Sequence, residues 1–246
     1  MSETQHFGGR TIVGTIQRRL LVNALVDPDE AARQLPAGLR PHVTDGGTVI
    51  GCCLLDIHAI RPAGLPASIG RRLRAAAHRI SIEWDDEHGV TSVGVYVPVR
   101  HTESRAARVL GGRWFPGVHR RATIGLHDDG RYINWSVEPA DRATEYGITV
   151  IASITSTSPA PPSEPIAGTC LSAAVGLSPD HRGALEAARM EPANRLAHRV
   201  AIDNLDSAFL ARFTTAQPAP SYLMRDVDVS WTKARVPQLA LLKART

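Results

Sequence analysis

The chain has 246 residues, 43% of them apolar and 21% charged, with a formal net charge of +4 at pH 7. These proportions are typical of a soluble globular protein, and so small a net charge argues against a nucleic-acid partner. No run of about 18 apolar residues offers a membrane span, and residues 1–10 lack the features of a secretory signal. We therefore expect a cytoplasmic protein with neither a membrane nor a nucleic-acid partner.

The first elements predicted are a long strand or strand pair at 11–26, where β-branched residues and leucines alternate with polar ones. A short helix follows, because Asp27 suits the N-cap, Pro28 suits the first helical position, and Glu30 sits where a capping-box acid belongs. It ends at Pro36.

The middle of the chain predicts strands joined by tight turns. Alternating apolar positions and turn residues place them at 39–42, 48–60, 78–85, 90–100, 122–126, 132–137 and 148–155. A loop with one or two helical turns is expected at 64–77, and a short helix at 103–110. Residues 111–123, GGRWFPGVHRRAT, predict a tight turn that delivers the start of a buried strand, which is where a small-molecule site would form.

The densest basic cluster consists of Arg71, Arg72, Arg74 and Arg79. We interpret it as a solvated face, because no aromatic residues interleave with it as nucleic-acid stacking would need. Binding of a phosphate or carboxylate is the alternative.

The last third predicts a surface loop at 157–165, helices at 171–176, 180–189 and 205–213, and strands at 195–202 and 222–233. Many short strands with few and short helices favour a β-rich α+β fold, an antiparallel closed cone or barrel. We expect a single domain over residues 1–246, with 1–10 as a candidate disordered tail.

Cysteine and lysine usage limits the chemistry. Cys52 and Cys53 are adjacent on a predicted strand and point to opposite faces, so we interpret them as reduced, buried residues. A nucleophilic role stays open for Cys170, at the start of a predicted helix. The chain has 26 arginines but only two lysines, Lys233 and Lys243. Because a guanidinium cannot replace a Schiff-base amine, imine chemistry is confined to these two lysines or the N-terminus.

Several site types have no motif here. The sequence contains no GxGxxG, P-loop, GxSxG or HExxH pattern, and its histidines and cysteines lack metal-ligand spacing. We therefore expect neither a metal nor a cofactor.

Three segments together resemble the acetoacetate decarboxylase superfamily. Residues 17–41, QRRLLVNALVDPDEAARQLPAGLRP, resemble its N-terminal strand and helix; 111–121, GGRWFPGVHRR, its aromatic-proline turn; and 227–238, VDVSWTKARVPQ, its final strand. The resemblance spans residues 18–238 and is to an uncharacterised branch rather than to the true decarboxylases. It implies a closed antiparallel cone with the site inside, lined by Phe115 and Trp231 of the matching segments.

The resemblance also implies an imine-forming lysine directly after the aromatic-proline pair, and here Phe115-Pro116 is followed by Gly117. True acetoacetate decarboxylase activity is therefore not expected. Lys233 could replace the amine only from the terminal strand, where it more simply marks an exposed strand end.

The resemblance further implies a carboxylate-binding arginine on the first strand and an acid in the pocket. Arg18 and Arg19 both match, on opposite faces of the strand, and we prefer Arg19 because it shares a face with Leu21. Glu83 is the candidate acid. After the turn, His119 is a candidate general acid or base and Arg121 a candidate anion clamp, although adjacent polar residues are equally typical of an exposed turn.

Two hypotheses lead. The first is a lyase, dehydratase or isomerase that acts without an imine on a small carboxylated or carbonyl compound, with His119 and Glu83 as the acid and base and Arg19 or Arg121 as the clamp. The second is a non-catalytic ligand-binding protein of the same fold. A nucleic-acid binder using the basic cluster is third. A homo-oligomer is compatible with each.

Overall fold

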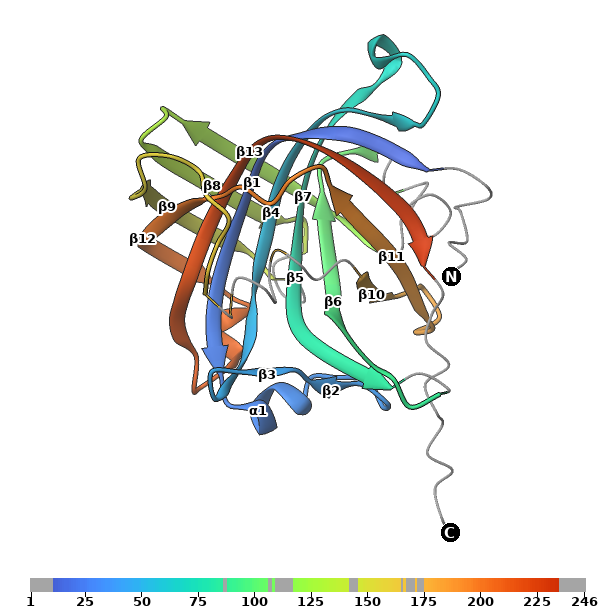
Figure 1. Cartoon of the computed structure of the whole chain (residues 1–246), viewed down its shortest axis with the longest axis vertical. Helices are drawn as coiled ribbons and strands as arrows, with labels where there is room; N and C mark the ends of the chain where they lie inside the picture. Colours follow the sequence, from blue (N-terminus) through green and yellow to red (C-terminus); the bar gives the residue numbers. More distant parts are fainter. Residues whose placement is uncertain are drawn as a thin grey trace.

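A computed structural model describes residues 11–85, 88–105, 108, 117–141, 146–164, 166, 171 and 175–234. Within them the chain forms thirteen strands and almost no helix (Figure 1). The strands are β1 Ile12–Val26, β2 Arg40–Pro41, β3 Val43–Thr44, β4 Gly47–Pro62, β5 Arg71–Asp85, β6 Thr91–Thr102, β7 His119–Asp128, β8 Tyr132–Pro139, β9 Ile148–Ile154, β10 Val175–Pro179, β11 Leu185–Pro192, β12 His198–Ser207 and β13 Gln217–Ala234. The predicted β-rich fold is confirmed.

The strands close into two circuits that share one wall. The path β6-β7-β8-β9-β12-β13-β1-β4-β5 returns to β6 through the β5–β6 pairing, which makes a closed nine-stranded barrel among the described strands. A second circuit leaves β6 through β10 and β11 and rejoins β13 through the β11–β13 pairing. The strands β13, β1, β4, β5 and β6 therefore form a wall with an enclosed space on each side. The predicted closed antiparallel barrel is confirmed, with short parallel contacts only where β6 meets β7 and β10.

The two faces of the shared wall pack into different cores. Leu20 and Cys52 face a cluster that contains the fully buried Trp135 of β8, inside the nine-stranded barrel. Leu21 and Cys53 face a second cluster on the opposite side. Period-two alternation produces this division, because successive side chains of a strand point to opposite faces. Cys52 and Cys53 are both free and buried, as predicted; Cys170 lies outside the described residues.

The predicted helix at Asp27 is present as α1, Pro28–Ala32, and one of its capping groups has a different role from the expected one. The Asp27 side chain accepts hydrogen bonds from the backbone N–H groups of Asp29 and Glu30 and so caps the helix. Glu30 does not complete a capping box. Its carboxylate accepts four hydrogen bonds from the backbone and hydroxyl groups of Thr214 and Thr215, which tie α1 to the start of β13. The Thr215 hydroxyl and these backbone groups lower the Glu30 pKa to about 2.

Two helical predictions were wrong, and a third is confirmed only in part. Residues 180–189 form the turn and second arm of the β10–β11 hairpin, because Asp180 accepts from the backbone of Arg182 and Ala184 and Gly183 takes a φ of 81°. Residues 205–207 continue β12, and only the 3-10 turn Leu210–Arg212 follows. The region 64–77 contains the 3-10 turn Ala67–Ile69 and the first half of β5. In each case pairing on a neighbouring strand overrides local helix propensity.

No helix among the described residues is long and apolar enough to cross a membrane.

Candidate functional site

The second circuit brings polar side chains onto one face of the shared wall. Strand register aligns Tyr222 of β13, Leu21 of β1, Cys53 of β4, Ala77 of β5 and Arg100 of β6 in one row across five strands. β7 extends this row, because His119 pairs with Arg100. Two of the segments that resemble the decarboxylase superfamily, 17–41 and 111–121, therefore contribute a residue to this row.

Arg19 lies on the same face, next to this row, and is 4% exposed. Its Nε donates to the Cys53 Sγ at 3.3 Å and its Nη1 points to the Met224 Sδ at 3.6 Å. Sulfur is a weak acceptor, and no ion pair of Arg19 occurs among the described residues. A buried guanidinium without a carboxylate partner is uncommon, because desolvation of a charge is costly.

Arg18, unlike Arg19, has a carboxylate partner. Its side chain points to the opposite face of β1, where it forms an ion pair with Asp128. The structure thus places Arg19, the arginine preferred from the sequence, on the buried face with Cys53.

A second buried arginine, Arg79 of β5, contacts the neighbouring row. Its Nη2 donates to the Asn23 Oδ1 at 2.5 Å across Gly51 of β4. Gly51 is required there, because a Cβ would lie 2.0 Å from the Val22 carbonyl oxygen. The prediction that Arg79 belongs to a solvated basic face is wrong, because the residue is only 4% exposed.

Arg100 was not predicted as a site residue. Its Nε and Nη2 donate to the Ser178 hydroxyl of β10 at 3.2 and 2.9 Å. Burial lowers the Arg100 pKa to about 10, so it stays protonated at neutral pH. The residue as a whole is partly buried.

His119 joins this group at the start of β7. Its Nδ1 lies 3.2 Å from the Gly117 carbonyl oxygen, which can only accept, so in the neutral ring Nδ1 carries the proton and Nε2 is the acceptor. Burial and the charge of Arg100 lower the His119 pKa to about 4. The imidazole is therefore neutral at pH 7.

Gly117 occupies the position to which the resemblance assigns the imine-forming lysine. Its φ is 79°, and a Cβ would lie 2.5 Å from the Ser178 Cβ. Its N–H donates to the Glu186 carboxylate at 2.7 Å. Backbone conformation and packing therefore both disfavour a side chain here.

The remaining predicted site residues lie apart from this group. Glu83 accepts from Arg40 and contacts His42 at the β2 edge; Arg121 is exposed; and Trp231 packs in a separate apolar cluster. Phe115 lies outside the described residues.

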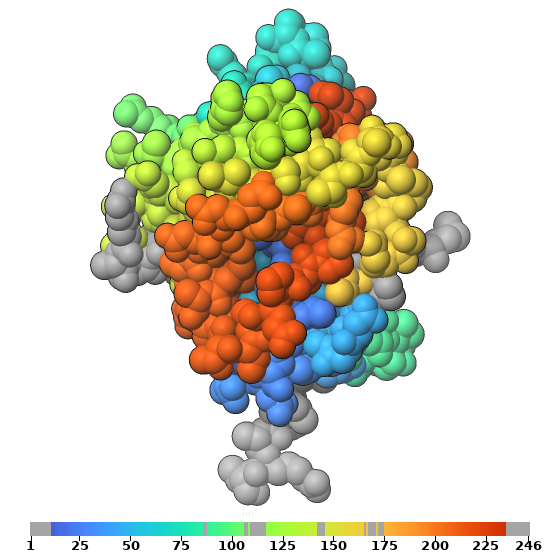
Figure 2. All heavy atoms as spheres, turned by 90° about the vertical axis from the view of Figure 1, so that its left-hand side faces the viewer, coloured from blue at the N-terminus to red at the C-terminus, as the bar shows by residue number. Residues whose placement is uncertain are grey.

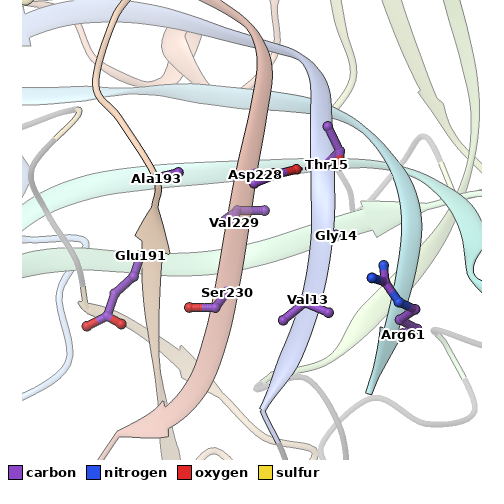
Figure 3. A pocket seen from close by; sticks show the side chains of 9 residues that line it. All are labelled: Val13, Gly14, Thr15, Arg61, Glu191, Ala193, Asp228, Val229 and Ser230. Carbon is purple, nitrogen blue, oxygen red and sulfur yellow. Dashed lines mark hydrogen bonds between the residues drawn. The ribbon is translucent and has the colours of Figure 1, made fainter. Parts of the chain in front are cut away.

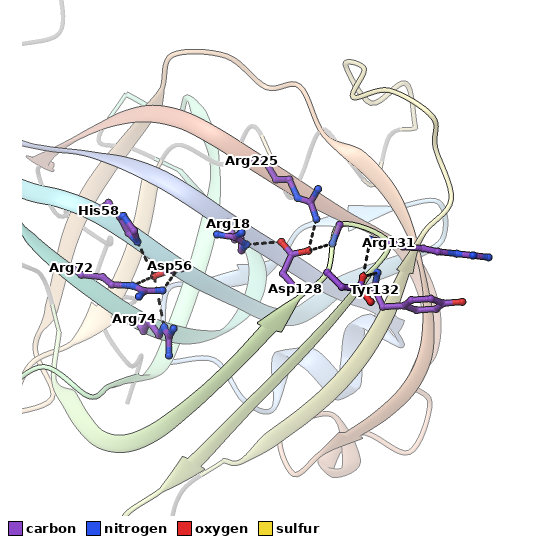
Figure 4. Close-up of polar contacts among 11 residues, drawn as sticks. Arg18, Asp56, His58, Arg72, Arg74, Asp128, Arg131, Tyr132 and Arg225 are labelled. Atoms are coloured by element: carbon purple, nitrogen blue, oxygen red, sulfur yellow. Dashed lines mark hydrogen bonds and ion pairs between the residues drawn. The ribbon is translucent and has the colours of Figure 1, made fainter.

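The predicted basic cluster is split between two faces. Arg72 and Arg74 sit beside the fully buried Asp56, with Arg72 donating two hydrogen bonds to it at 2.8 and 2.7 Å (Figure 4). Asp128, 4% exposed, holds Arg18 and Arg225 in the same manner. The arginines on this face are neutralised by protein carboxylates.

The surface of the protein is also hollowed. A groove of about 490 Å³ runs over β1, β13 and the end of β11, where Thr15 donates to Asp228 and Glu191 points outward (Figure 3). Figure 2 shows another hollow on the side where β12 lies, with blue atoms of the N-terminal region at its floor. No cluster of metal-binding side chains occurs within the described part of the chain.

Known structures with a similar fold were found, although no similar curated sequence was. No family model and no curated sequence matches the chain. The chain is similar in structure to an acetoacetate decarboxylase from Legionella pneumophila (TM-score 0.57, 13% identity, covering 93% of this chain and 88% of that one). It is also similar to an acetoacetate decarboxylase-like enzyme from Sphingomonas wittichii RW1 (0.60, 15%, 93% of each chain) and to the enduracididine biosynthesis enzyme MppR complexed with pyruvate (0.57, 11%, 91% and 88%). The chain has the acetoacetate decarboxylase-like fold.

Proposed function

We propose that the chain binds a small carboxylated carbonyl compound on the Arg19 face of the shared wall and transforms it by proton transfer without an imine. The observation that carries this proposal is Arg19, a buried guanidinium whose described partners are two sulfur atoms. A carboxylate in the site would supply the missing counter-charge with two parallel hydrogen bonds. The pyruvate complex of one structural neighbour supports a ligand of this class.

His119 is the group that we assign to proton transfer. Its Nδ1–H is engaged by the Gly117 carbonyl, so Nε2 accepts the proton from the carbon next to the ligand's carbonyl, and the electron pair moves to the carbonyl oxygen. Return of the proton to another atom gives an isomerase, and loss of a leaving group gives a lyase or dehydratase. We assign no role to Glu83, because Arg40 and His42 hold its carboxylate.

A pocket protein that binds without chemistry is the second candidate. The low His119 pKa favours it, because a histidine with a pKa of about 4 is a weak base at neutral pH. The two candidates share the ligand and differ only in turnover.

Binding is tested by calorimetric titration of pyruvate and acetoacetate into the wild type and the Arg19→Gln variant. We expect binding to weaken at least about tenfold in the variant, equivalent to about 1.4 kcal/mol. Arg33→Gln, at an exposed arginine after α1, is the control and keeps wild-type affinity. Equal binding by Arg19→Gln would refute the proposal.

Chemistry is tested by following deuterium exchange into the pyruvate methyl group by NMR. Exchange that is lost in His119→Asn supports the enzyme, and binding without exchange supports the pocket protein. Borohydride treatment with either keto acid should leave the protein mass unchanged; a reduced adduct on Lys233 would contradict the imine-free mechanism.

A further inference from the structure

We propose that the ligand is a diacid, with Arg19 binding one carboxylate and Arg100 the other. The proposal rests on the proposed function, since it uses the same face of the wall, and it adds a second anion subsite that sets the substrate class.

The first subsite lies between β4 and β13. Arg19 Nε is directed at Cys53 on β4, and its Nη1 is directed at Met224 on β13. These contacts leave the outer edge of the guanidinium, with its second Nη, as the part that can meet a carboxylate.

The second subsite is oriented toward the opposite wall. Arg100 donates through Nε and Nη2 to Ser178 of β10, a strand that pairs with the far edge of β6. Glu186 is the acid that interacts electrostatically with it. No ion pair within 4.0 Å joins Arg100 to Glu186 among the described residues, and the Glu186 carboxylate binds the Gly117 N–H instead. Within the described part of the chain, Arg100 thus has no direct carboxylate partner.

The separation of the two arginines argues against one shared carboxylate. Three strand spacings lie between β1 and β6, which is roughly 14 Å at about 4.8 Å per spacing. Arg19 is held by contacts on β4 and β13, whereas Arg100 is held by Ser178 of β10, so we assign a separate carboxylate to each guanidinium.

The floor between the subsites suits a short carbon chain. Cys53 and Ala77 lie between Leu21 and Arg100 in the register row, and both have small apolar side chains. Val97, Ile166 and Leu171 belong to the same buried cluster, so a ligand on this strip would be enclosed by apolar side chains. An apolar strip with a cation at each end matches a molecule with methylene groups between two carboxylates.

The experiment titrates matched pairs of acids into the full chain: butanoate against succinate, pentanoate against glutarate, and pyruvate against 2-oxoglutarate. We expect at least one diacid to bind about tenfold more tightly than its monoacid partner, about 1.4 kcal/mol. Arg100→Gln should remove that difference and leave monoacid binding close to wild type. Arg19→Gln should weaken both classes.

The outcomes separate this inference from the proposed function. If no acid binds, both fail. If monoacids bind and no diacid binds more tightly, or if Arg100→Gln keeps the diacid preference, the second subsite is refuted and the proposed function stands. Circular dichroism and thermal unfolding check that the variants fold. Should Arg100→Gln not fold, Ser178→Ala, which removes the hydroxyl that orients the guanidinium, is expected to reduce the diacid preference selectively, and an unchanged preference would overturn the proposal.

Discussion

The two faces of the shared wall differ in the partners of their arginine side chains. On the face toward β7, the arginines around Asp56 and Asp128 each have a buried carboxylate as partner. On the other face, Arg19 and Arg100 contact sulfur atoms and a hydroxyl group. Arg18 and Arg19 are adjacent in the sequence and lie on different sides of this division. We infer that a buried charge with a counter-charge in the protein belongs to the fold. A buried charge without such a partner indicates a binding site for a ligand of opposite charge.

The largest stability effect is expected on the neutralised face. Asp56→Asn removes the fully buried carboxylate that holds the half-exposed Arg72 and the partly buried Arg74, and leaves both guanidinium groups without this counter-charge. We expect a loss of about 2–4 kcal/mol in the free energy of unfolding, measured in urea. Asp85→Asn, which breaks an exposed ion pair with Arg40, is the control and should change stability little.

The same variant has a pH signature. Burial alone would raise the Asp56 pKa, but the hydrogen bonds from Arg72 hold it below its usual value. The stabilisation is therefore present above the unfolded-state pKa of about 3.9 and is lost as the pH falls through the folded-state pKa. The deficit of Asp56→Asn should shrink toward acid pH, and a pH-independent deficit would mean that packing, not charge, is responsible.

The next largest loss of stability is expected at Gly117, just before β7. Gly117→Ala places a Cβ 2.5 Å from the Ser178 Cβ at a φ of 79°, and we expect a loss of about 2–3 kcal/mol from clash and strain together. Gly130→Ala is a matched control, because its φ is 92° but nothing lies within 4 Å of the added Cβ; it should lose about 1 kcal/mol. Thermal unfolding of both variants compares them, and equal losses would show that Gly117 is needed for its backbone conformation alone.

A smaller effect of opposite sign is expected at Arg19. Arg19→Met replaces an unpaired buried cation by an apolar chain that suits Met224 and Cys53, so the ligand-free protein should gain about 1 kcal/mol while carboxylate binding is lost. Urea unfolding with and without pyruvate measures both. A loss of stability in the ligand-free variant would make Arg19 a structural residue and would remove the contrast between the faces.

The sequence predicted the fold well where pattern and pairing agree. Period-two alternation placed Arg18 and Arg19 on opposite faces, and Asp27 capped α1 as expected. It failed for residues 180–189, where an alanine-rich segment with high helix propensity pairs with β10 and β13 instead. Partners on distant strands decide such segments, and local propensity carries no information about them.

The candidate site was predictable only in part. Arg19 and His119 were selected in advance, and both lie on the face that carries the proposed site. Arg100 was missed, because its partner Ser178 is 78 residues away and its strand reads as a regular hairpin arm. Glu83 looked like a pocket acid from the sequence, yet Arg40 and His42 bind it after the chain folds back at β2.

The smallest predicted effect links Arg100 to His119. Burial and the Arg100 charge hold the His119 pKa near 4. A bound carboxylate beside Arg100 would offset the second cause but not the first, so the pKa should rise by about one unit or less while remaining below the usual 6.5. NMR titration of the His119 ring with and without succinate measures this shift. An unchanged pKa in a protein that binds succinate would place the second carboxylate away from Arg100, and a fall would mean that no anion enters beside it.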